Sequence, residues 1–352
     1  MERSIELLRE LTNADGVPGF ESEVRAIFER RLASHGEMSR DGIGGAACKK
    51  RGLADAPRVM LDCHLDEIGF IVQHITPGGF LKFLPLGGWS AQVLPAQRVR
   101  VWAGGAKITG VVGSTPPHLL APDKRDRVPE IRDLFIDVGA TSRAEAESWG
   151  IRIGAWAAPL SEFTPLANPK LFLAKAFDNR VGCALCIEVA EEISGHPNTL
   201  FACGSAQEEV GLRGATTGAR RIEPDVAIVL EGPPADDTPG FNADESQGAL
   251  GRGVQIRAYD PTMIANPRLV DLAIETARAG GIEHQVTVRS SGGTDAGAIH
   301  TSARGVPTIV LGVPARYIHS HASVINIDDY AAAKRLVLAL IIALDADRVA
   351  AL

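Results

Sequence analysis

The sequence predicts an α/β protein with a mostly parallel or mixed sheet flanked by helices and an inserted small β-barrel-like domain. Three observations lead to this fold class. Segments with helical spacing of apolar residues alternate with short apolar runs up to about residue 72, and again from about residue 169. Between residues 73 and 168 that spacing disappears, and short β-rich pieces are separated by Gly and Pro turns. Some apolar runs are apolar on both sides, which is typical of central strands covered by helices.

The first part of the chain reads as two helices followed by strands. Residues 4–12 and 21–34 repeat apolar residues at helical spacing, and residues 16–19 between them form a Gly/Pro turn. A polar strand is expected at 44–50, and a central strand in the run from 57 to 75. We therefore expect the first part of the larger domain to end at residue 72.

The second part resumes the alternation of strands and helices after the insertion. Asp178 is a candidate N-cap for a helix over about 179–193. The remaining predicted elements are strands at 200–206, 225–230, 286–288 and 307–312, and helices at 267–279, 294–301 and 328–344. The expected domains are thus a catalytic domain of residues 1–72 plus 169–352, and an inserted β-rich domain of residues 73–168.

Composition and charge exclude several classes of protein. The chain has 352 residues, of which 45% are hydrophobic and 22% charged, as expected for a globular protein with a core. A net charge of −7 and the lack of a Lys/Arg cluster argue against a nucleic-acid partner. The charged N-terminal segment is unlike a secretory signal, and no apolar run approaches the roughly 18 residues that span a membrane. Five cysteines fit reduced thiols, so we expect a cytoplasmic protein with no membrane partner.

The central motif is a pair of carboxylates, Glu208 and Glu209, directly after the apolar run 200–206. Adjacent glutamates are commonly a solvated surface pair. This pair, however, follows a buried strand, and open α/β sheets build their sites at the carboxyl ends of strands. Glycines at 211 and 214 then turn the chain.

Four further candidate ligands, His64, Asp178, Glu231 and His319, each lie in a similar setting at the end of an apolar run. Each has a plain alternative: a core histidine, a helix cap, or a side chain turned to solvent. Together they match metal-assisted hydrolysis, which needs carboxylates and imidazoles to bind metal and a neighbouring carboxylate to handle a proton. Asp66 stands two residues after His64, on the same side of a strand, where it would accept the second ring proton of His64.

A series of motifs runs in order through nearly the whole chain. They are HLDEIGFIV at 64–72, LPLGGWSAQVLPAQRV at 84–99, GVVGSTPPHL at 110–119, LFIDVGA at 134–140, KAFDNRVGC at 175–183, SAQEEVGLRGA at 205–215, PADDTPG at 234–240, GGTDAGAIH at 292–300 and RYIHS at 316–320. Together they resemble the cytosolic co-catalytic metallo-aminopeptidases that assemble into tetrahedral dodecamers. That family includes deblocking and glutamyl aminopeptidases, and some members were once labelled as cellulases.

The resemblance implies a dinuclear site with two divalent metal ions per subunit, Zn or Co. His64 and Glu231 would bind one ion, Glu209 and His319 the other, and Asp178 would bridge both. One ligand departs from the family pattern, since Glu231 replaces the usual Asp and so moves the carboxylate by about one bond length.

The resemblance also implies roles for residues beside the ligands. Asp66 would orient His64, and Glu208 would be the general base. His321 stands where a Pro is common, either as a support for His319 or as an exposed side chain. The substrate-specificity pocket is not located by spacing, although Arg289 and the stretch after residue 281 are candidates for it.

The implied function is removal of N-terminal residues from peptides by metal-activated water, in a homododecamer or a dimer held together by the inserted domain. Three alternatives stay open from the residues. A non-enzymatic, metal-stabilised scaffold would explain the changed ligand at 231 but not the retention of Glu208. A glycoside hydrolase would use Glu208 and Glu231 as its two carboxylates and would leave both histidines unexplained. An amidase acting on blocked substrates is the third.

Overall fold

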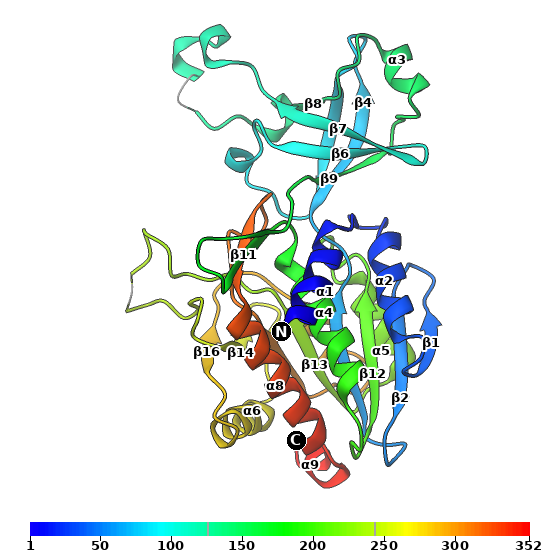
Figure 1. The fold of residues 1–352 in the computed structure, drawn as a ribbon, viewed down its shortest axis with the longest axis vertical. Coiled ribbons are helices and arrows are strands. Elements are labelled where there is room, and N and C mark those ends of the chain that lie inside the picture. Colours follow the sequence, from blue (N-terminus) through cyan, green and yellow to red (C-terminus); the bar gives the residue numbers. More distant parts are fainter. Residues whose placement is uncertain (125–126, 243) are drawn as a thin grey trace.

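The computed structural model describes residues 1–124, 127–242 and 244–352, and it divides into a larger α/β part and a smaller β-barrel (Figure 1). In the described part of the chain, the larger part contains a nine-stranded sheet. Its path, from edge to edge, is β1 (Glu37–Arg40), β2 (Ala46–Arg51), β12 (Thr199–Ser205), β3 (Arg58–His64), β13 (Val226–Glu231), β17 (Thr308–Gly312), β14 (Val254–Asp260) and β15 (Met263–Ile264), with β16 (His284–Val288) paired to β14.

The centre of this sheet is parallel, and helices cover both of its faces. Strands β12, β3, β13 and β17 are parallel neighbours, whereas β2 runs antiparallel to β12, and β14 runs antiparallel to β17. One face packs against α1 (Glu2–Asn13), α2 (Ser22–Leu32), α4 (Phe177–Glu192), α6 (Pro267–Ala279) and α8 (Ile327–Ala343), and the other against α5 (Arg213–Ile222) and α7 (Ala296–Ile299). The short α9 (Ala346–Ala350) ends the chain. The predicted α/β class with a mixed sheet is therefore confirmed.

The inserted domain is a closed barrel with its own apolar core. Its strands follow the order β4 (Gly69–Ile75), β5 (Leu81–Leu86), β8 (Phe135–Asp137), β7 (Ala106–Gly113), β6 (Arg98–Ala103) and β9 (Trp156–Pro159). Its described residues also form α3 (Arg143–Ser148) and the short 3₁₀ turns η1 (Ala91–Val93), η2 (Pro117–Leu119), η3 (Pro122–Lys124) and η4 (Ile131–Asp133).

The sequence suggested one central strand in the run from 57 to 75, but this run does not form a single strand. It breaks after His64 into β3 of the large sheet and β4 of the barrel, so the expected boundary at 72/73 falls inside a barrel strand. At the other end the barrel strands stop at Pro159, before the expected boundary at 168/169. Both strands are strongly apolar because both are buried, and for that reason hydrophobicity alone could not separate them.

A small four-stranded sheet between the two parts was not predicted. It joins β10 (Thr164–Pro165), β11 (Leu171–Ala174), β19 (Ser323–Asn326) and β18 (Ala315–Arg316). This sheet brings residues near 320 beside the segment that leaves the barrel. It therefore places the His319 loop at the junction of the two parts.

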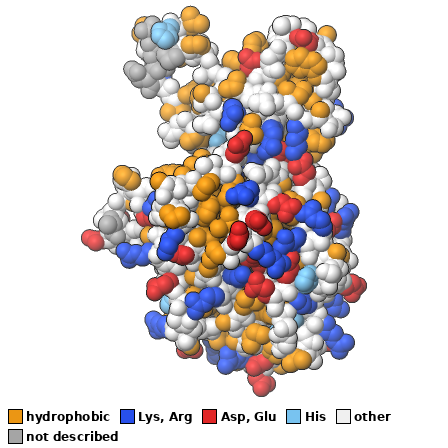
Figure 2. All heavy atoms as spheres, in the orientation of Figure 1, with side chains coloured by type: hydrophobic (Ala, Val, Ile, Leu, Met, Phe, Trp, Pro, Cys, Tyr) orange, Lys and Arg blue, Asp and Glu red, His pale blue; other side chains and the backbone are white. Residues whose placement is uncertain are grey.

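Ion pairs fix the barrel on the larger domain. Arg100 and Lys107 of the barrel lie 3.0 and 2.8 Å from the buried carboxylate of Asp15. Lys175 lies 3.3 Å from the same carboxylate and 2.5 Å from Glu67, close to the end of β3. In the space-filling view, basic and acidic side chains gather on the surface where the barrel meets the larger domain (Figure 2). These contacts hold the barrel in a defined position above the carboxyl ends of the central strands.

Two smaller expectations concern cysteines and membranes. All five cysteines are buried and free, as expected for reduced thiols, and Cys183 and Cys186 lie fully inside the core. Across the described ranges, none of the helices combines the length and the apolar character that crossing a bilayer requires.

Candidate functional site

The carboxyl ends of three neighbouring parallel strands meet at one edge of the large sheet. His64 is the last residue of β3, Glu231 is the last residue of β13, and Glu208 and Glu209 follow β12. Because β12, β3 and β13 are adjacent, these side chains converge although they are far apart in sequence.

Asp178 reaches the same point from the start of α4, but not as the cap of that helix. Its φ and ψ of −81° and 102° are not helical. The side-chain oxygen of Asn179 accepts a hydrogen bond from the backbone N–H of Gly182 at 3.0 Å, so Asn179 performs the capping that we expected of Asp178. Both carboxylate oxygens of Asp178 are thereby left to face the two histidines.

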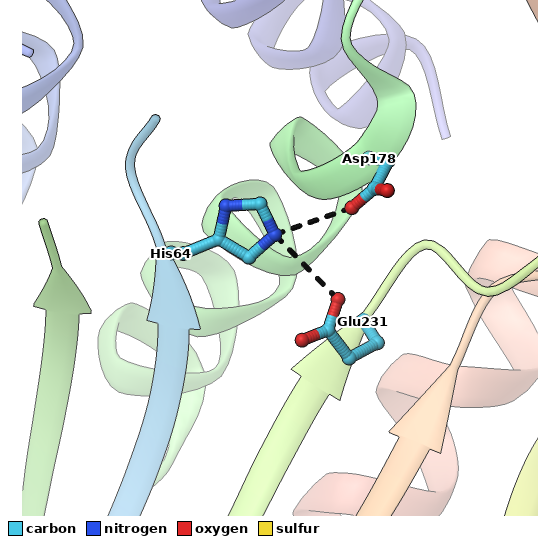
Figure 3. Close-up of side chains that lie close together, drawn as sticks. All are labelled: His64, Asp178 and Glu231. Carbon is cyan, nitrogen blue, oxygen red and sulfur yellow. Dashed lines mark hydrogen bonds and ion pairs between the residues drawn. The ribbon is translucent and has the colours of Figure 1, made fainter. Parts of the chain in front are cut away.

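The first group of ligands comprises His64, Asp178 and Glu231 (Figure 3). The Nε2 atom of His64 lies 3.2 Å from Oδ1 of Asp178 and 3.7 Å from Oε2 of Glu231. One ligand atom of each residue lies within 4.8 Å of the others, which is the spacing that one metal ion can span. His64 and Glu231 are buried, so the group is shielded from bulk water.

The second group comprises Asp178, Glu209 and His319. Nε2 of His319 lies 3.4 Å from Oδ2 of Asp178 and 3.6 Å from Oε2 of Glu209. Asp178 thus offers one oxygen to each group. The structure therefore brings together all five residues that the resemblance assigns as metal ligands.

Asp66 supports the site differently from the expected pairing of two side chains. Nδ1 of His64 lies 3.2 Å from the main-chain oxygen of Asp66 and 3.6 Å from its carboxylate. The carboxylate instead accepts hydrogen bonds from the backbone N–H groups of Glu208 and Glu209, at 3.0 and 3.1 Å. Because β3 ends at His64, the strand alternation that we applied to Asp66 does not continue to it.

Glu208 lies beside the two groups but belongs to neither. Its Oε2 atom is 3.9 Å from Nε2 of His64, and the side chain lines the cavity over the site. A carboxylate at the edge of a ligand cluster, and not inside it, is free to accept a proton.

The charges of these residues are strongly coupled. Burial raises the pKa of Glu208 and the pKa of Glu209 to about 8 each, and it raises the pKa of Glu231 well above its usual range. Burial alone would lower the pKa of His319, but its contacts with Asp178 and Glu209 outweigh this effect and raise the pKa to about 10. The site thus contains more buried carboxylates than the charges of His64 and His319 can neutralise.

This donor set fits divalent cations. Imidazole nitrogens and carboxylate oxygens are the ligands that zinc and similar ions bind in proteins. Within the described residues, Oε1 of Glu231 is buried without a hydrogen-bond partner, as expected for an atom whose partner is not part of the protein. Asp236 and Asp237 do not offer an alternative, because they pair with Arg289 and Arg316 at 2.7 and 2.6 Å.

A cavity of about 440 Å³ opens over both groups, and Arg257 is a lining residue that sequence reasoning missed. Arg257 is a buried side chain of β14 whose Nη1 atom lies 3.1 Å from Asp260. The available signal was an arginine between the apolar residues Ile256 and Ala258 of β14. Arg289 was the candidate for the substrate-specificity pocket, but it is not among the described residues that line this cavity. It binds Asp236 and the main chain of Pro234 instead.

Comparisons with known proteins identify the family of this chain. The sequence pattern described as M42 glutamyl aminopeptidase matches residues 44–336. The glutamyl aminopeptidase of Lactococcus lactis subsp. cremoris (strain MG1363) is 37% identical over 349 residues, which is 97% of this chain and 97% of the relative. The chain belongs to the M42 peptidase family. The predicted resemblance is therefore confirmed.

Further similar proteins include a lysyl aminopeptidase and two TET peptidases. The lysyl aminopeptidase of Pyrococcus furiosus is 33% identical and covers 92% of each chain. The TET aminopeptidase of Thaumarchaeota archaeon SCGC AB-539-E09 has a TM-score of 0.96 and 41% identity, covering 100% of this chain and 99% of its own. A TET1 peptidase of Pyrococcus horikoshii has a TM-score of 0.85 and 29% identity, with 97% and 100% covered.

Proposed function

We propose that this chain is an aminopeptidase that removes N-terminal residues from peptides with the help of two divalent metal ions, Zn or Co. The observation that carries the proposal is the pair of ligand groups that share Asp178 beneath one open cavity. His64 and Glu231 would hold one ion, and Glu209 and His319 the other. When bound, such ions supply a Lewis acid for the scissile carbonyl and lower the pKa of water.

The residues of this chain would perform the remaining steps. Glu208 would take a proton from the attacking water and pass it to the leaving amine, which is the usual work of a general base and acid. Asp66 would hold the backbone of Glu208 and Glu209 in place, and its main-chain oxygen would keep the Nε2 atom of His64 free. The buried carboxylates would favour a substrate with a free, positively charged α-amine.

We propose further that acidic N-terminal residues are preferred. Arg257 lies in the lining of the cavity and carries a permanent positive charge, and its Nε atom is buried without a hydrogen-bond partner in the described structure. A substrate carboxylate entering beside it would meet guanidinium donors already held in place by Asp260. The similar glutamyl aminopeptidase is consistent with this preference, whereas the lysyl aminopeptidase shows that similar proteins differ in it.

Self-association into a homododecamer, or into a dimer, is the corresponding proposal for assembly. The similar TET1 peptidase assembles into a tetrahedron or an octahedral shell. The inserted barrel is the proposed contact region because it exposes large apolar side chains, which often mark interfaces. They are Phe80, Leu84, Val111, Leu119, Val128, Trp149 and Ile153. Free, buried cysteines fit a reducing compartment, and we propose the cytoplasm.

The alternatives make different predictions. Glycoside hydrolysis by Glu208 and Glu231 would need no histidine, yet both carboxylates lie against the same nitrogen of His64. A non-enzymatic scaffold would bind metal and would not need Glu208 at the edge of the ligand groups.

The deciding experiment strips the protein of metal and adds back Zn²⁺, Co²⁺ or Mn²⁺ before assay on chromogenic glutamyl, leucyl and lysyl substrates. We expect activity only after metal is added, with the glutamyl substrate cleaved fastest. An N-acetylated glutamyl substrate is the control, and its cleavage at the same rate would favour the amidase alternative. Activity that persisted without metal on every substrate would refute the proposal.

A further inference from the structure

Two adjacent glycines of the barrel, Gly87 and Gly88, lie against the second ligand group. These residues follow β5 and lie beside Glu209 and His319. A Cβ atom on Gly87 would come within 3.0 Å of Oε2 of Glu209, and one on Gly88 would come within 3.1 Å of Nδ1 of His319. A Cβ on Gly88 would require the ring of His319 to move by a few tenths of an ångström. At Gly87, φ is +84° and a Cβ would also come within 2.5 Å of Cγ2 of Ile68, so this position requires glycine.

The main chain of this loop makes a direct contact with His319. Nδ1 of His319 lies 2.7 Å from the carbonyl oxygen of Gly88, and so it is the nitrogen that carries the proton and donates. Nε2 is then the nitrogen on the side that faces Asp178 and Glu209. The side chain of His319 is 37% exposed.

Trp89 holds the loop in this position. Its ring stacks on Phe70 of β4 with centroids 4.8 Å apart, and its Nε1 donates a hydrogen bond to the carbonyl of Gly69 at 3.1 Å. The other contact of the indole is with the ring of His321, at 5.2 Å. Trp89 therefore lies between a barrel strand and the loop that carries His319.

His321 is explained by this contact. It is 4% exposed, and neither of its ring nitrogens has a hydrogen-bond partner within the described ranges. Its ring therefore contributes through packing against Trp89, and it ties the position of residue 319 to the position of the barrel.

We infer that Gly88 and Trp89 of the inserted barrel are positioning residues for His319, so that the barrel completes the metal site as well as the fold. The carbonyl of Gly88 sets which nitrogen of His319 is free, and Trp89 with His321 keeps that carbonyl in place. This inference rests on the proposed function, in which His319 is a metal ligand. It assigns to the barrel a part in metal binding in addition to any part in assembly.

The test compares Gly88→Ala with Gly78→Ala in the full-length protein. Gly78 is an exposed glycine of the same barrel, and a Cβ there would meet only the ring of Phe80 at an ordinary 3.6 Å. Metal-free protein is titrated with Co²⁺, and the loaded protein is then titrated with chelator and analysed for metal. We expect Gly78→Ala to match wild type. In Gly88→Ala the added Cβ, 3.1 Å from Nδ1 of His319, should push the imidazole away from the carbonyl of residue 88. The variant should then bind one of its two ions about 10- to 100-fold more weakly, as is usual when the contact that orients a histidine ligand is lost.

A second pair of variants guards against a folding defect. Trp89→Phe keeps a ring between Phe70 and His321 and should retain both ions, whereas Trp89→Leu should lose the same ion as Gly88→Ala while circular dichroism stays unchanged. Wild-type affinity for both ions in Gly88→Ala and Trp89→Leu would overturn the inference and leave the proposed function intact. A wild-type protein that bound no Co²⁺ would overturn both.

Discussion

Replacement of Arg257 by Met should abolish a preference for acidic N-terminal residues. The side chain lies in the cavity over the ligand groups, with Nη1 on Asp260 and with Nε unpartnered in the described structure. Met keeps most of the apolar length of the side chain and removes the guanidinium. The substrate carboxylate would then lose its charged donor, whereas the α-amine and the scissile bond would meet the same residues as before.

The expected size of the effect follows from the type of contact. A hydrogen bond to a charged group contributes about 1.5 to 3 kcal/mol. Since each 1.4 kcal/mol is about tenfold, the ratio of kcat/KM for glutamyl over leucyl substrates should fall roughly 10- to 150-fold. The lower end is expected because Asp260 already neutralises part of the charge on Arg257.

The assay measures kcat/KM on glutamyl and leucyl substrates, with thermal unfolding as a check on stability. Arg257→Met leaves Asp260 buried without its cation, although Thr262 still donates to Asp260 from its backbone N–H and its hydroxyl. Adding Asp260→Asn removes that unpaired charge. Arg289→Met is the matched control, because it breaks a similar Arg–Asp pair that does not line the described cavity. An unchanged glutamyl-to-leucyl ratio in Arg257→Met would refute the reasoning.

Three further predictions concern the ligand groups. Asp178→Asn should lose both ions, because Asp178 contributes to both groups, and full occupancy by metal analysis would contradict its bridging role. Glu208→Gln should keep its metal while activity falls by roughly two to four orders of magnitude, and a variant that lost metal instead would make Glu208 a ligand. Glu231→Asp should stay active with an altered metal preference, whereas Glu231→Ala should release the ion held with His64 first during chelator titration. Wild-type retention of two ions in Glu231→Ala would exclude it as a ligand.

The sequence by itself determined the fold class, and it singled out as candidate ligands five residues that the structure brings together. Local signals predicted the fold class and the setting of these residues, and the family resemblance assigned their roles. An uninterrupted apolar run followed by His or Glu marks the end of a buried strand, and the ends of parallel strands meet at one edge of a sheet. For this reason His64, Glu209 and Glu231 could be grouped before any distance was known.

Local geometry at the same residues was less predictable. Asp66 was expected to face His64 through its carboxylate, but β3 ends at His64 and the main-chain oxygen of Asp66 is the closer atom. Asp178 was expected to cap a helix that Asn179 caps instead. Strand alternation and capping preferences apply inside regular elements, and both residues lie where an element begins or ends.

The tertiary structure decided how the barrel, the pocket and the ligands meet. Gly88 and His319 are 231 positions apart, and their hydrogen bond depends on the seating of one domain on another. Arg257 enters the cavity because β14 runs beside β17, which no local pattern specifies. Hydrophobic periodicity reports which face of an element is buried, but not which distant element covers it, and these contacts exist only once long-range packing has brought the two parts of the chain together.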